Sequence, residues 1–386
     1  MSGLIVHSRE PLNAEPSLAR LRERFVTGSE DFYVRTHGDI PKLDATRFRL
    51  NIGGLVDAPL ELSLEALQTR FETRDVVAVM QCAGNRRADL LAVKKVSGDP
   101  WAPGAIGNAR WTGVALADVL LAAGMADAAG LHVEFGGADE IRQKGKQFRF
   151  GVSIPIEKAR APEVILAWAM NGEPLRPEHG FPLRAVVPGY AGIRSAKWLT
   201  QIDVRESPAE GPLQADDYKL YPADVSEADA DPARGMTIDE MPLNAAICVP
   251  ADGAVVTAGV VTVRGYATAM GRGVSRVEVS GNGGQSWVQA TIAPGGSAWS
   301  WVLWEAEVPL SGGARELAVR AWDGAGQTQP ATAGEIWNFK GYLCNSWHRV
   351  GVTVTQGLRR TLPRRMTPSG YGMNPVRRAE APQSQV

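Results

Sequence analysis

The amino-acid sequence predicts an α+β domain followed by an all-β sandwich of the immunoglobulin type. Before residue 207, helical stripes of apolar residues alternate with short strand-like runs, which is typical of α+β domains. Beyond residue 243, short runs that are rich in Val and Thr or that alternate between apolar and polar residues follow one another, as in sandwiches. The proline- and acid-rich stretch between them, Ser207 to Leu243, is expected to be an extended connector.

Two helices and four strands are predicted in the first half. Ser63 is a suitable N-cap for a helix whose apolar face carries Leu64, Leu67 and Phe71. Gly124 is a suitable stop for a second helix, whose apolar stripe is Leu116, Val119, Leu120 and Ala123. Strands are predicted at Phe48 to Ile52, Val76 to Val79, Leu131 to Phe135 and Arg184 to Val187.

The second half reads as consecutive strands. The run from Val255 to Tyr266 is rich in Val and Thr, which favours β structure, and the alternating run from Val274 to Ser280 predicts a strand. A Gly-Asn-Gly-Gly turn then leads into Trp287 to Ile292, which indicates a β-hairpin, and a further strand is expected around Val319. We therefore predict an α+β domain at 1–238, a sandwich at 239–352 and a basic, proline-containing tail at 353–386.

The composition is that of a soluble globular protein. The chain has 386 residues, a formal net charge of −1 and 44% hydrophobic residues, which is enough for two domains. A net charge so close to zero gives no indication of nucleic acid as a partner. No apolar stretch is long enough for a membrane span. Met1 to Pro16 lacks the pattern of a signal peptide, which predicts a cytoplasmic protein as the sequence stands, or a periplasmic one if a leader peptide has been removed. Three cysteines do not form a disulfide framework, and two of them are expected to be apolar fillers, Cys248 and Cys344.

The third cysteine, Cys82, lies in the most informative run of the chain, Met80-Gln81-Cys82-Ala83-Gly84-Asn85-Arg86-Arg87. It follows a predicted strand and precedes Gly84 and Asn85, which are expected to form a sharp turn. Neighbouring cations favour the thiolate, which binds soft metals or attacks electrophiles, and arginine forks bind oxyanions. The run therefore predicts a soft-metal ligand or a nucleophile beside an anion site, with Arg86 bracing the loop and Arg87 facing the anion.

This run resembles the molybdenum-cysteine loop of the sulfite oxidase family. The resemblance implies that Cys82 binds molybdenum and that a molybdopterin supplies the other sulfur ligands. It also implies that the α+β domain is the molybdopterin-binding domain and that the immunoglobulin-like sandwich forms a homodimer.

Further motifs of the family occur in the same order along the chain. The run Phe32-Tyr33-Val34-Arg35-Thr36-His37 is similar to an arginine-bearing strand that lines the cofactor, which implies cofactor contacts for Tyr33, Val34, Arg35, Thr36 and His37. The region from His179 to Trp198 is similar to the segment that holds the pterin and its phosphate, which implies the same role for His179, Arg184, Ser195, Ala196 and Lys197. Asp139 matches a further pterin contact.

The resemblance also implies a pocket for a small oxyanion, made of Arg35, Arg87, Trp101, Tyr218 and Lys340. Lys340 departs from the arginine of animal and plant sulfite oxidases; it keeps the charge but loses the bidentate fork. The nitrate reductases of the family resemble this chain less at Tyr218 and Lys340, so the pair favours sulfite as the substrate. Taken singly, each of these residues has an ordinary structural interpretation; the order of the motifs favours the functional one.

The leading hypothesis is molybdenum-dependent oxidation of sulfite to sulfate. Because no haem-binding module is recognised in this chain, the electrons are expected to pass to a separate acceptor, such as a cytochrome c or oxygen. Two alternatives stay open at this point. The scaffold also suits a nitrate or sulfoxide reductase, and the chain could be a molybdenum cofactor-binding protein without turnover.

Overall fold

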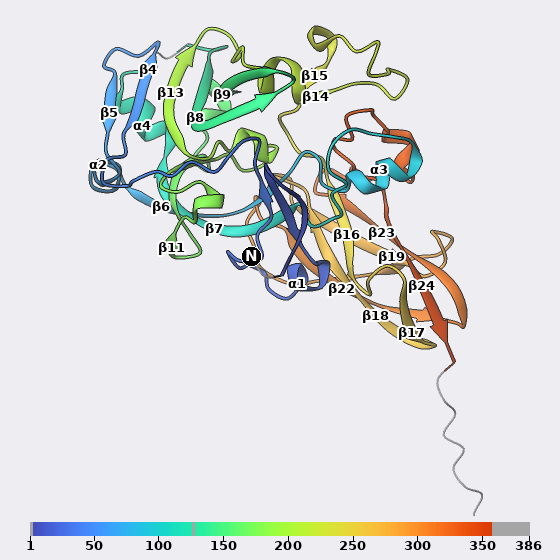
Figure 1. Ribbon diagram of the computed structural model, residues 1–386. Helices are drawn as coiled ribbons and strands as arrows, with labels where there is room; N and C mark the ends of the chain where they lie inside the picture. The colour runs from blue at the N-terminus through green and yellow to red at the C-terminus, as the bar shows by residue number, and fades with distance from the viewer. Residues whose placement is uncertain (1–2, 126–127, 357–386) are drawn as a thin grey trace, which may run out of the picture.

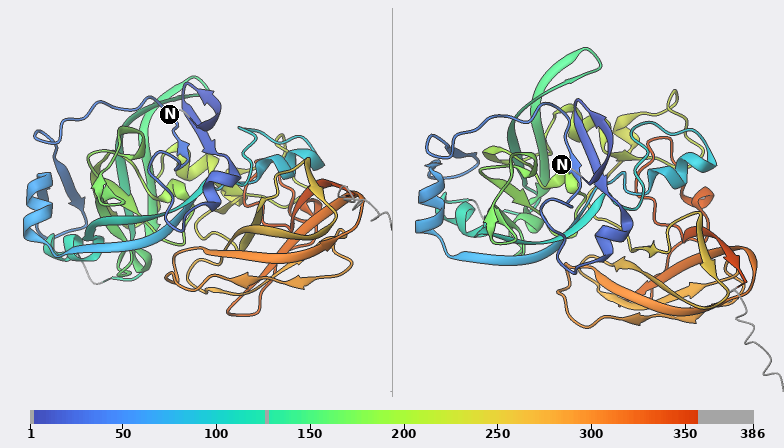
Figure 2. Two further views of the ribbon diagram at one scale, coloured as in Figure 1. Left: turned by 90° about the horizontal axis from the view of Figure 1, so that it is seen from below. Right: turned by 60° about the horizontal axis from the view of Figure 1, so that its bottom comes forward.

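The structure is a computed structural model that describes residues 3–125 and 128–356. Figure 1 shows two bodies: a strand-rich N-terminal half, coloured blue to green, and a sandwich coloured yellow to red. Seen from below and from a tilted angle, the sandwich keeps its own layers beside the N-terminal half (Figure 2). The predicted α+β domain followed by an all-β sandwich is confirmed.

Two five-stranded sheets form most of the N-terminal half. One consists, in spatial order, of β5 (Leu60–Leu62), β4 (Leu50–Gly54), β13 (Leu199–Arg205), β8 (His132–Gln143) and β9 (Lys146–Pro155). The other consists of β11 (Glu173–Pro174), β10 (Ile165–Met170), β7 (Ile106–Ala115) and β6 (Thr73–Gln81), with β12 (Arg184–Val186) also paired to β10. All four strands predicted in this half overlap observed strands.

A small N-terminal sheet packs on this half. It consists of β1 (Leu4–Arg9), β2 (Leu12–Pro16) and the short β3 (Val34–Arg35), and its register places Asn13 opposite Arg35. The sheet therefore carries the arginine-bearing run of the sequence on a fixed backbone.

The helices are short and few. They are α1 (Leu18–Arg22), α2 (Leu64–Arg70), α3 (Arg87–Val93), α4 (Leu116–Ala122) and α5 (Ile156–Ala159). Ser63 caps α2 by accepting a hydrogen bond from the Ala66 N–H, as predicted, and Gly124 follows α4 with a φ of 70°. Single turns are η1 (Pro177–His179), η2 (Gly192–Arg194), the π-helical η3 (Leu213–Asp217), η4 (Pro232–Arg234) and η5 (Ala333–Ile336). Within the described ranges, no helix has the length and apolar character that a membrane span requires.

Two sheets form the sandwich. One consists of β16 (Asn244–Val249), β18 (Gly259–Thr268), β22 (Val302–Leu310) and β21 (Thr291–Ile292). The other consists of β17 (Ala254–Thr257), β24 (His348–Thr355), β23 (Gly313–Asp323), β19 (Val274–Ser280) and β20 (Val288–Gln289). β24 ends three residues beyond the predicted domain boundary at Val352, and most of the predicted tail lies outside the described residues.

Two β-rich runs of the sequence are divided between the two sheets of the sandwich. The Val- and Thr-rich run from Val255 to Tyr266 forms β17 and β18, which belong to different sheets, because Gly259 with a φ of 136° reverses the chain between them. The predicted hairpin strand from Trp287 to Ile292 is also divided. β20 pairs with β19, whereas β21 pairs with β22 in the opposite sheet.

The hydrophobic core joins the two halves. The sandwich has a core of its own, built on residues such as Val277 and Val319. A larger core of the N-terminal half continues into the sandwich through a set of fully or nearly buried residues, Ala246, Cys248, Tyr266, Met270, Trp301 and Leu303. Because non-polar area is buried across this contact, the halves are held together and not merely tethered. The domain boundary at residue 238 stays a prediction.

The connector from Ser207 to Leu243 is extended, as expected, but it also forms part of the site. It contains η3, η4 and the two-stranded ribbon of β14 (Lys219–Leu220) and β15 (Met236–Thr237). Tyr218 lies directly after η3 and is buried. The irregular backbone of the connector thus brings one of the predicted site residues into the interior.

Gly265 provides a test of how tightly the sandwich is packed. A Cβ at this position would lie 1.9 Å from the carbonyl oxygen of Ala246 and 2.4 Å from the Trp304 ring. We expect Gly265→Ala to lower the free energy of unfolding by about 1–3 kcal/mol, because backbone and indole must both move. Urea unfolding measures this change. Gly334→Ala is the control, since the nearest atom to its new Cβ would be 3.9 Å away, and equal losses in the two variants would contradict the packing argument.

Candidate active site

A pocket with about 640 Å³ of empty space, open mouth included, lies in the N-terminal half and gathers most of the predicted site residues. Its lining includes eleven of them: Tyr33, Arg35, Thr36, His37, Cys82, Asp139, His179, Arg184, Ser195, Lys197 and Tyr218. They come from β3 and the residues beside it, from the loop after β6, from β8, from the region that starts at η1, and from the position directly after η3. Residues as far apart in the chain as Tyr33 and Tyr218, which are 185 positions from each other, therefore line the same pocket.

The loop that carries Cys82 is held by backbone hydrogen bonds. The Cys82 N–H donates to the carbonyl of Ala105 at 2.9 Å, and the Arg86 N–H donates to that of Ala102 at 3.2 Å. Within the loop, the Gly84 N–H lies 3.4 Å from the Cys82 Sγ. The segment at 102–105 is itself fixed by the buried carboxylate of Glu15, which accepts hydrogen bonds from the Ala102 and Gly104 N–H groups at 2.8 and 2.9 Å. The thiol is thus presented by a loop with little freedom to move.

The predicted turn of this loop is present: Gly84 and Asn85 lie within it, and the Asn85 N–H donates to the carbonyl of Cys82 at 3.0 Å. The residue with a positive φ is Arg86, at 64°. Gly84 is needed for space, because a Cβ there would lie 2.6 Å from the Arg87 Nη2. The turn therefore places a strained non-glycine residue at the start of α3, where it sends its side chain away from the pocket.

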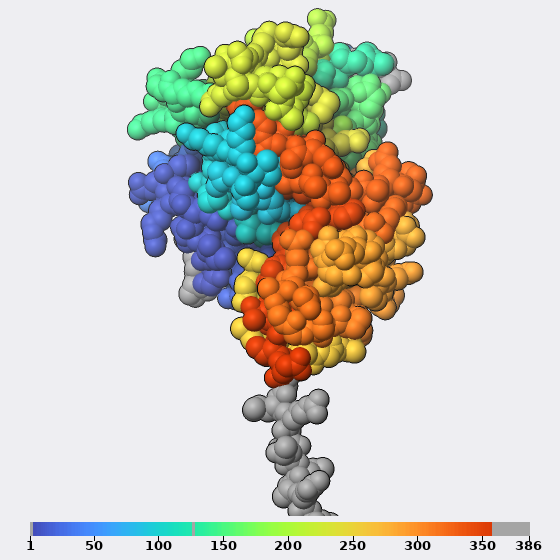
Figure 3. All heavy atoms as spheres, turned by 90° about the vertical axis from the view of Figure 1, so that its right-hand side faces the viewer, coloured from blue at the N-terminus to red at the C-terminus, as the bar shows by residue number. Residues whose placement is uncertain are grey.

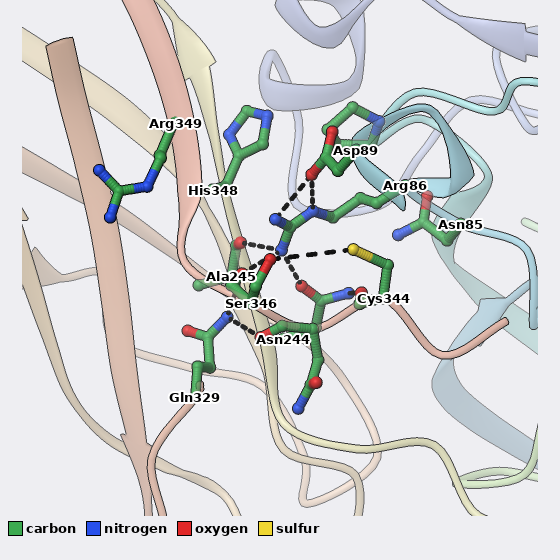
Figure 4. Close-up of polar contacts among 12 residues, drawn as sticks. Asn85, Arg86, Asp89, Asn244, Ala245, Gln329, Cys344, Ser346, His348 and Arg349 are labelled. Carbon is green, nitrogen blue, oxygen red and sulfur yellow. Dashed lines mark hydrogen bonds and ion pairs between the residues drawn. The ribbon is translucent and has the colours of Figure 1, made fainter. Parts of the chain in front are cut away.

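Arg86 extends into the sandwich, as Figure 4 shows. Its side chain is completely buried. Its Nε donates to the Asp89 Oδ2 at 2.9 Å, and its Nη2 forms an ion pair with the same oxygen at 2.8 Å. Its Nη1 donates to the Asn244 Oδ1 at 2.9 Å and to the carbonyl of Ser346 at 2.7 Å. The predicted bracing of the loop is thus a contact between the Cys82 loop and the sandwich. In the space-filling view, the cyan segment around α3 is bordered by the blue N-terminal hairpin and by the orange-red end of the sandwich (Figure 3).

Arg87 points the other way and is surrounded by glycine. Its Nε donates to the carbonyl of Gly341 at 3.1 Å and its Nη1 donates to the carbonyl of Asp99 at 3.0 Å. A Cβ at Gly84, Gly98 or Gly341 would come within 2.6–2.8 Å of the Arg87 side chain. Arg87 is buried by this packing and, unlike the prediction, is not part of the pocket lining. Both of its hydrogen-bond acceptors are neutral carbonyls, so its positive charge is not cancelled by them.

Positive charge gathers at the pocket. Burial lowers the pKa of Arg184 to about 10 and that of Lys197 to about 7. Arg184 donates to the carbonyls of His179 and Ser195 and to the Met80 Sδ, and Lys197 donates to the carbonyl of Glu178. None of the described carboxylates is close enough to either cation for an ion pair. These are cations that an anionic ligand would stabilise.

Two polar groups near Lys197 have free binding capacity. Burial lowers the pKa of His179 to about 3, so the ring is neutral; its Nε2 donates to the Ser29 carbonyl at 3.0 Å, which leaves Nδ1 as an acceptor. Burial raises the pKa of Asp139 to about 6, and its Oδ1 is buried without a partner in the described structure. Both groups could accept hydrogen bonds from a ligand rich in N–H donors.

Arg35, His37 and Tyr218 line the same pocket as Cys82 and interact with one another or with Cys82 electrostatically. Burial lowers the pKa of Arg35, but attraction from Tyr218 and Cys82 outweighs it, and the net pKa is raised. The Arg35 Nη1 donates to the Asn13 Oδ1 at 3.2 Å and to the Thr36 carbonyl. The His37 Nε2 lies 2.7 Å from the Tyr218 hydroxyl; burial lowers the pKa of His37 and raises that of Tyr218, so both are neutral at pH 7.

Four other predicted residues lie outside the pocket lining. Trp101 is fully buried in the cluster that contains Cys82, with its ring centroid 4.8 Å from that of His7. Lys340 points to Asp217, whose Oδ1 is 3.6 Å from the Lys340 Nζ. Val34 and Ala196 are buried and can contribute only backbone groups or packing. The roles predicted for these residues and for Arg87 stay predictions.

Several lining or neighbouring residues were missed in the sequence. Phe32, Met80, Phe150, Glu178, Gly192, Ile193 and Trp198 also line the pocket, although all of them except Phe150 lie within or beside the motifs quoted above. Tyr342 was missed as well: its ring stacks on that of Tyr218, with centroids 5.3 Å apart. Proximity to Lys340 in the sequence was the only available signal for Tyr342, because its partner comes from a distant segment.

The residues of the pocket fit a molybdopterin with its metal. No group of three or more His, Cys, Asp or Glu side chains in the described ranges could hold a metal ion. A metal at Cys82 would therefore need most of its ligands from elsewhere, which is what a dithiolene supplies. The unpaired Arg184 and Lys197 suit a phosphate, and the free acceptors of His179 and Asp139 suit a pterin ring.

Comparison with known proteins agrees with this geometry. Residues 37–213 match the family described as oxidoreductase molybdopterin binding domain, and residues 235–355 match the Mo-co oxidoreductase dimerisation domain. The chain is 42% identical to the sulfite oxidase of Gallus gallus, covering 90% of this chain and 77% of that protein. It is 38% identical to the sulfite oxidase of Arabidopsis thaliana, covering 90% of this chain and 93% of that protein. The crystal structure of the sulfane dehydrogenase SoxCD from Paracoccus pantotrophus matches with a TM-score of 0.76 and 26% identity, covering 90% of this chain and 86% of that chain.

Fold and site together define a molybdopterin-binding oxidoreductase. More specifically, the chain belongs to the sulfite oxidase family of molybdenum enzymes.

The buried position of Arg86 predicts a large loss of stability on its removal. We expect Arg86→Met to lower the free energy of unfolding by about 3 kcal/mol, because it leaves Asp89, Asn244 and two carbonyl groups without their cation. Chemical denaturation measures the change. Arg110→Met is the matched control, since its ion pair with Asp75 is more than half exposed on the arginine side, and a change within about 0.5 kcal/mol is expected there. A loss below 1 kcal/mol for Arg86→Met would contradict the bracing role.

The lowered pKa of Lys197 predicts that anion binding depends on pH. Sulfate keeps its charge between pH 6 and 9, whereas Lys197, with a pKa of about 7, is protonated below this value and neutral above it. Cofactor-free protein should therefore bind sulfate roughly tenfold more weakly at pH 8.5 than at pH 6, as one charge-assisted hydrogen bond is lost. Isothermal titration calorimetry gives the affinities. In Lys197→Met the affinity should be low and should depend less on pH, since Asp139, with a pKa of about 6, is the neighbouring group that still titrates; an unchanged pH dependence would show that Lys197 is not its source.

Proposed function

We propose that this protein oxidises sulfite to sulfate with a molybdenum-molybdopterin cofactor bound through Cys82. The observation that carries the proposal is one pocket lining that combines a single cysteine, the arginine Arg35 and the neutral pair His37 and Tyr218. The similarity to sulfite oxidases over about 90% of the chain supports it. The reaction takes up water: sulfite plus water gives sulfate, two protons and two electrons.

When bound, the cofactor supplies the two-electron redox chemistry, and the protein supplies binding and orientation. Arg35 would attract the sulfite dianion, because its Nη2 makes no hydrogen bond with the described part of the chain. When His37 carries its proton on Nε2, it donates to the Tyr218 oxygen, and the Tyr218 hydroxyl hydrogen stays free to donate to the oxyanion. Since burial raises the pKa of Tyr218, the hydroxyl keeps this proton at neutral pH.

Arg87 and Lys340 would act through their charge. Neither lines the pocket, but the Arg87 guanidinium is bonded only to neutral carbonyls, so its field is available to an anion. The charge of Lys340 is offset by Asp217 at 3.6 Å. The expected contribution to anion binding is therefore larger for Arg87 than for Lys340.

The proposal extends to partners. Electrons would leave to a separate acceptor, of which a cytochrome c and oxygen are the two classes to test. The match of residues 235–355 to a dimerisation domain supports a homodimer through the sandwich. Nitrate is the alternative substrate on this scaffold, because the nitrate reductase of Hordeum vulgare is 37% identical over 373 residues. This chain spans only 41% of that protein.

Turnover by the molybdenum-loaded protein tests the proposal. We expect saturable, sulfite-dependent reduction of ferricyanide, and we expect Cys82→Ser to lose it together with bound molybdenum, because the hydroxyl is a poor soft-metal ligand. Cys344→Ser is the control: this cysteine is also buried, lies outside the pocket lining and should keep activity. Nitrate with a reduced dye is tested in parallel. Nitrate turnover without sulfite turnover, or full activity of Cys82→Ser, would refute the proposal.

A further inference from the structure

A turn between η5 and β24 reaches back from the sandwich to the Cys82 loop. In this turn, the Asn338 side chain accepts a hydrogen bond from the Tyr342 N–H at 3.0 Å and donates one to the Tyr342 carbonyl at 2.9 Å. The next residue, Leu343, has a φ of 56°, which is rare for a bulky side chain. Its N–H donates to the carbonyl of Ala83, directly after Cys82, at 2.8 Å. The turn is therefore fixed on both sides of Tyr342, and strain is retained at this point.

The fixed turn places the Tyr342 ring in contact with two candidate site residues. One contact is the stack on Tyr218, with centroids 5.3 Å apart and planes at 17°. The other is the guanidinium of Arg87, whose Cζ lies 5.2 Å from the ring centroid. Tyr218 in turn reaches His37 through its hydroxyl. Four side chains from four separate segments thus form a continuous row, and Tyr342 is the member that joins the cation to the tyrosine.

Two other residues of the turn, Phe339 and Lys340, contact partners other than Arg87 and Tyr218. Lys340 is paired with Asp217, and Phe339 packs against Tyr221 with centroids 5.1 Å apart. Tyr342 is therefore the residue of this turn that touches both Arg87 and Tyr218. No hydrogen bond of its hydroxyl to the rest of the described chain is present, so the ring, and not the hydroxyl, makes the contacts.

We propose that Tyr342 is a positioning residue of the oxyanion pocket, whose ring holds Arg87 and Tyr218 at a fixed separation. This rests on the proposed function, because it assigns those two residues to anion binding. Aromatic stacking and the cation–π contact each favour one geometry of their partners. Without the ring, Arg87 keeps its carbonyl partners but loses the aromatic surface that orients its guanidinium. Tyr218 loses the ring that stacks on its own ring. The sandwich, through this turn, would then contribute directly to substrate affinity.

Two substitutions of Tyr342 and one control test the proposal. Tyr342→Leu removes the ring, and Tyr342→Phe removes only the hydroxyl. Tyr221→Leu removes an aromatic contact to the same turn, at Phe339, without touching Arg87 or Tyr218. The loaded, full-length enzyme is used throughout. The readouts are KM and kcat for sulfite and, independently of turnover, the Kd of sulfate from calorimetry.

Tyr342→Leu is expected to raise both the KM for sulfite and the Kd for sulfate roughly tenfold. Tyr342→Phe should restore both to within about twofold, since the contacts belong to the ring. Unchanged sulfate affinity in Tyr342→Leu, an equal loss in Tyr221→Leu, or no rescue by Tyr342→Phe would overturn the assignment.

The sulfate measurement separates this proposal from the proposed function. If the unsubstituted enzyme binds sulfate but does not oxidise sulfite, the proposed function fails while the effect of Tyr342→Leu on sulfate affinity still decides the assignment. If the unsubstituted enzyme does not bind sulfate at all, the assignment fails as well.

Discussion

The burial of the Arg86 guanidinium between the two halves is the constraint on which the site depends. A fully buried cation needs partners that stabilise its charge, and here the Asp89 carboxylate of α3 and the Asn244 amide and backbone carbonyls of the sandwich supply them. To reach these partners, Arg86 must adopt a left-handed backbone, and this conformation in turn directs Arg87 to the opposite side. The position of Cys82 relative to the sandwich follows from the same turn. The sandwich is thus part of the foundation of the site.

A second constraint is electrostatic. Elsewhere in the described structure, cations such as Arg320 and Arg205 are paired with carboxylates. In the pocket, Arg184 and Lys197 are bonded mainly to carbonyl oxygens, and burial lowers the pKa of both. Cations held in this way raise the free energy of the empty protein and lower that of a complex with an anion. The pocket is therefore built for binding and not for the stability of the unliganded chain.

Local patterns in the sequence succeeded where the physics is local. The N-cap of Ser63 and the stop at Gly124 depend only on neighbouring residues, and both were predicted. The run from Val255 to Tyr266 was recognised as β-rich, but its division between two sheets was not, since periodicity does not show which sheet a strand joins or where the chain changes sheets. The turn after Cys82 was predicted, but the packing reason for its glycine was not. Gly84 is glycine because the Arg87 side chain occupies the space, and that packing is invisible in the order of residues.

The sequence by itself determined the chemistry that is available: one cysteine beside two arginines, the order of the motifs that identify the family, and eleven residues that line one pocket. Only the tertiary structure decided how these groups are used. It turned Arg86 into the sandwich, packed Arg87 among glycines, paired Lys340 with Asp217 and brought Tyr342 onto Tyr218. The physical reason is that side-chain direction and charge balance are set by partners that lie far away in the chain, whereas the residue types are read directly from it.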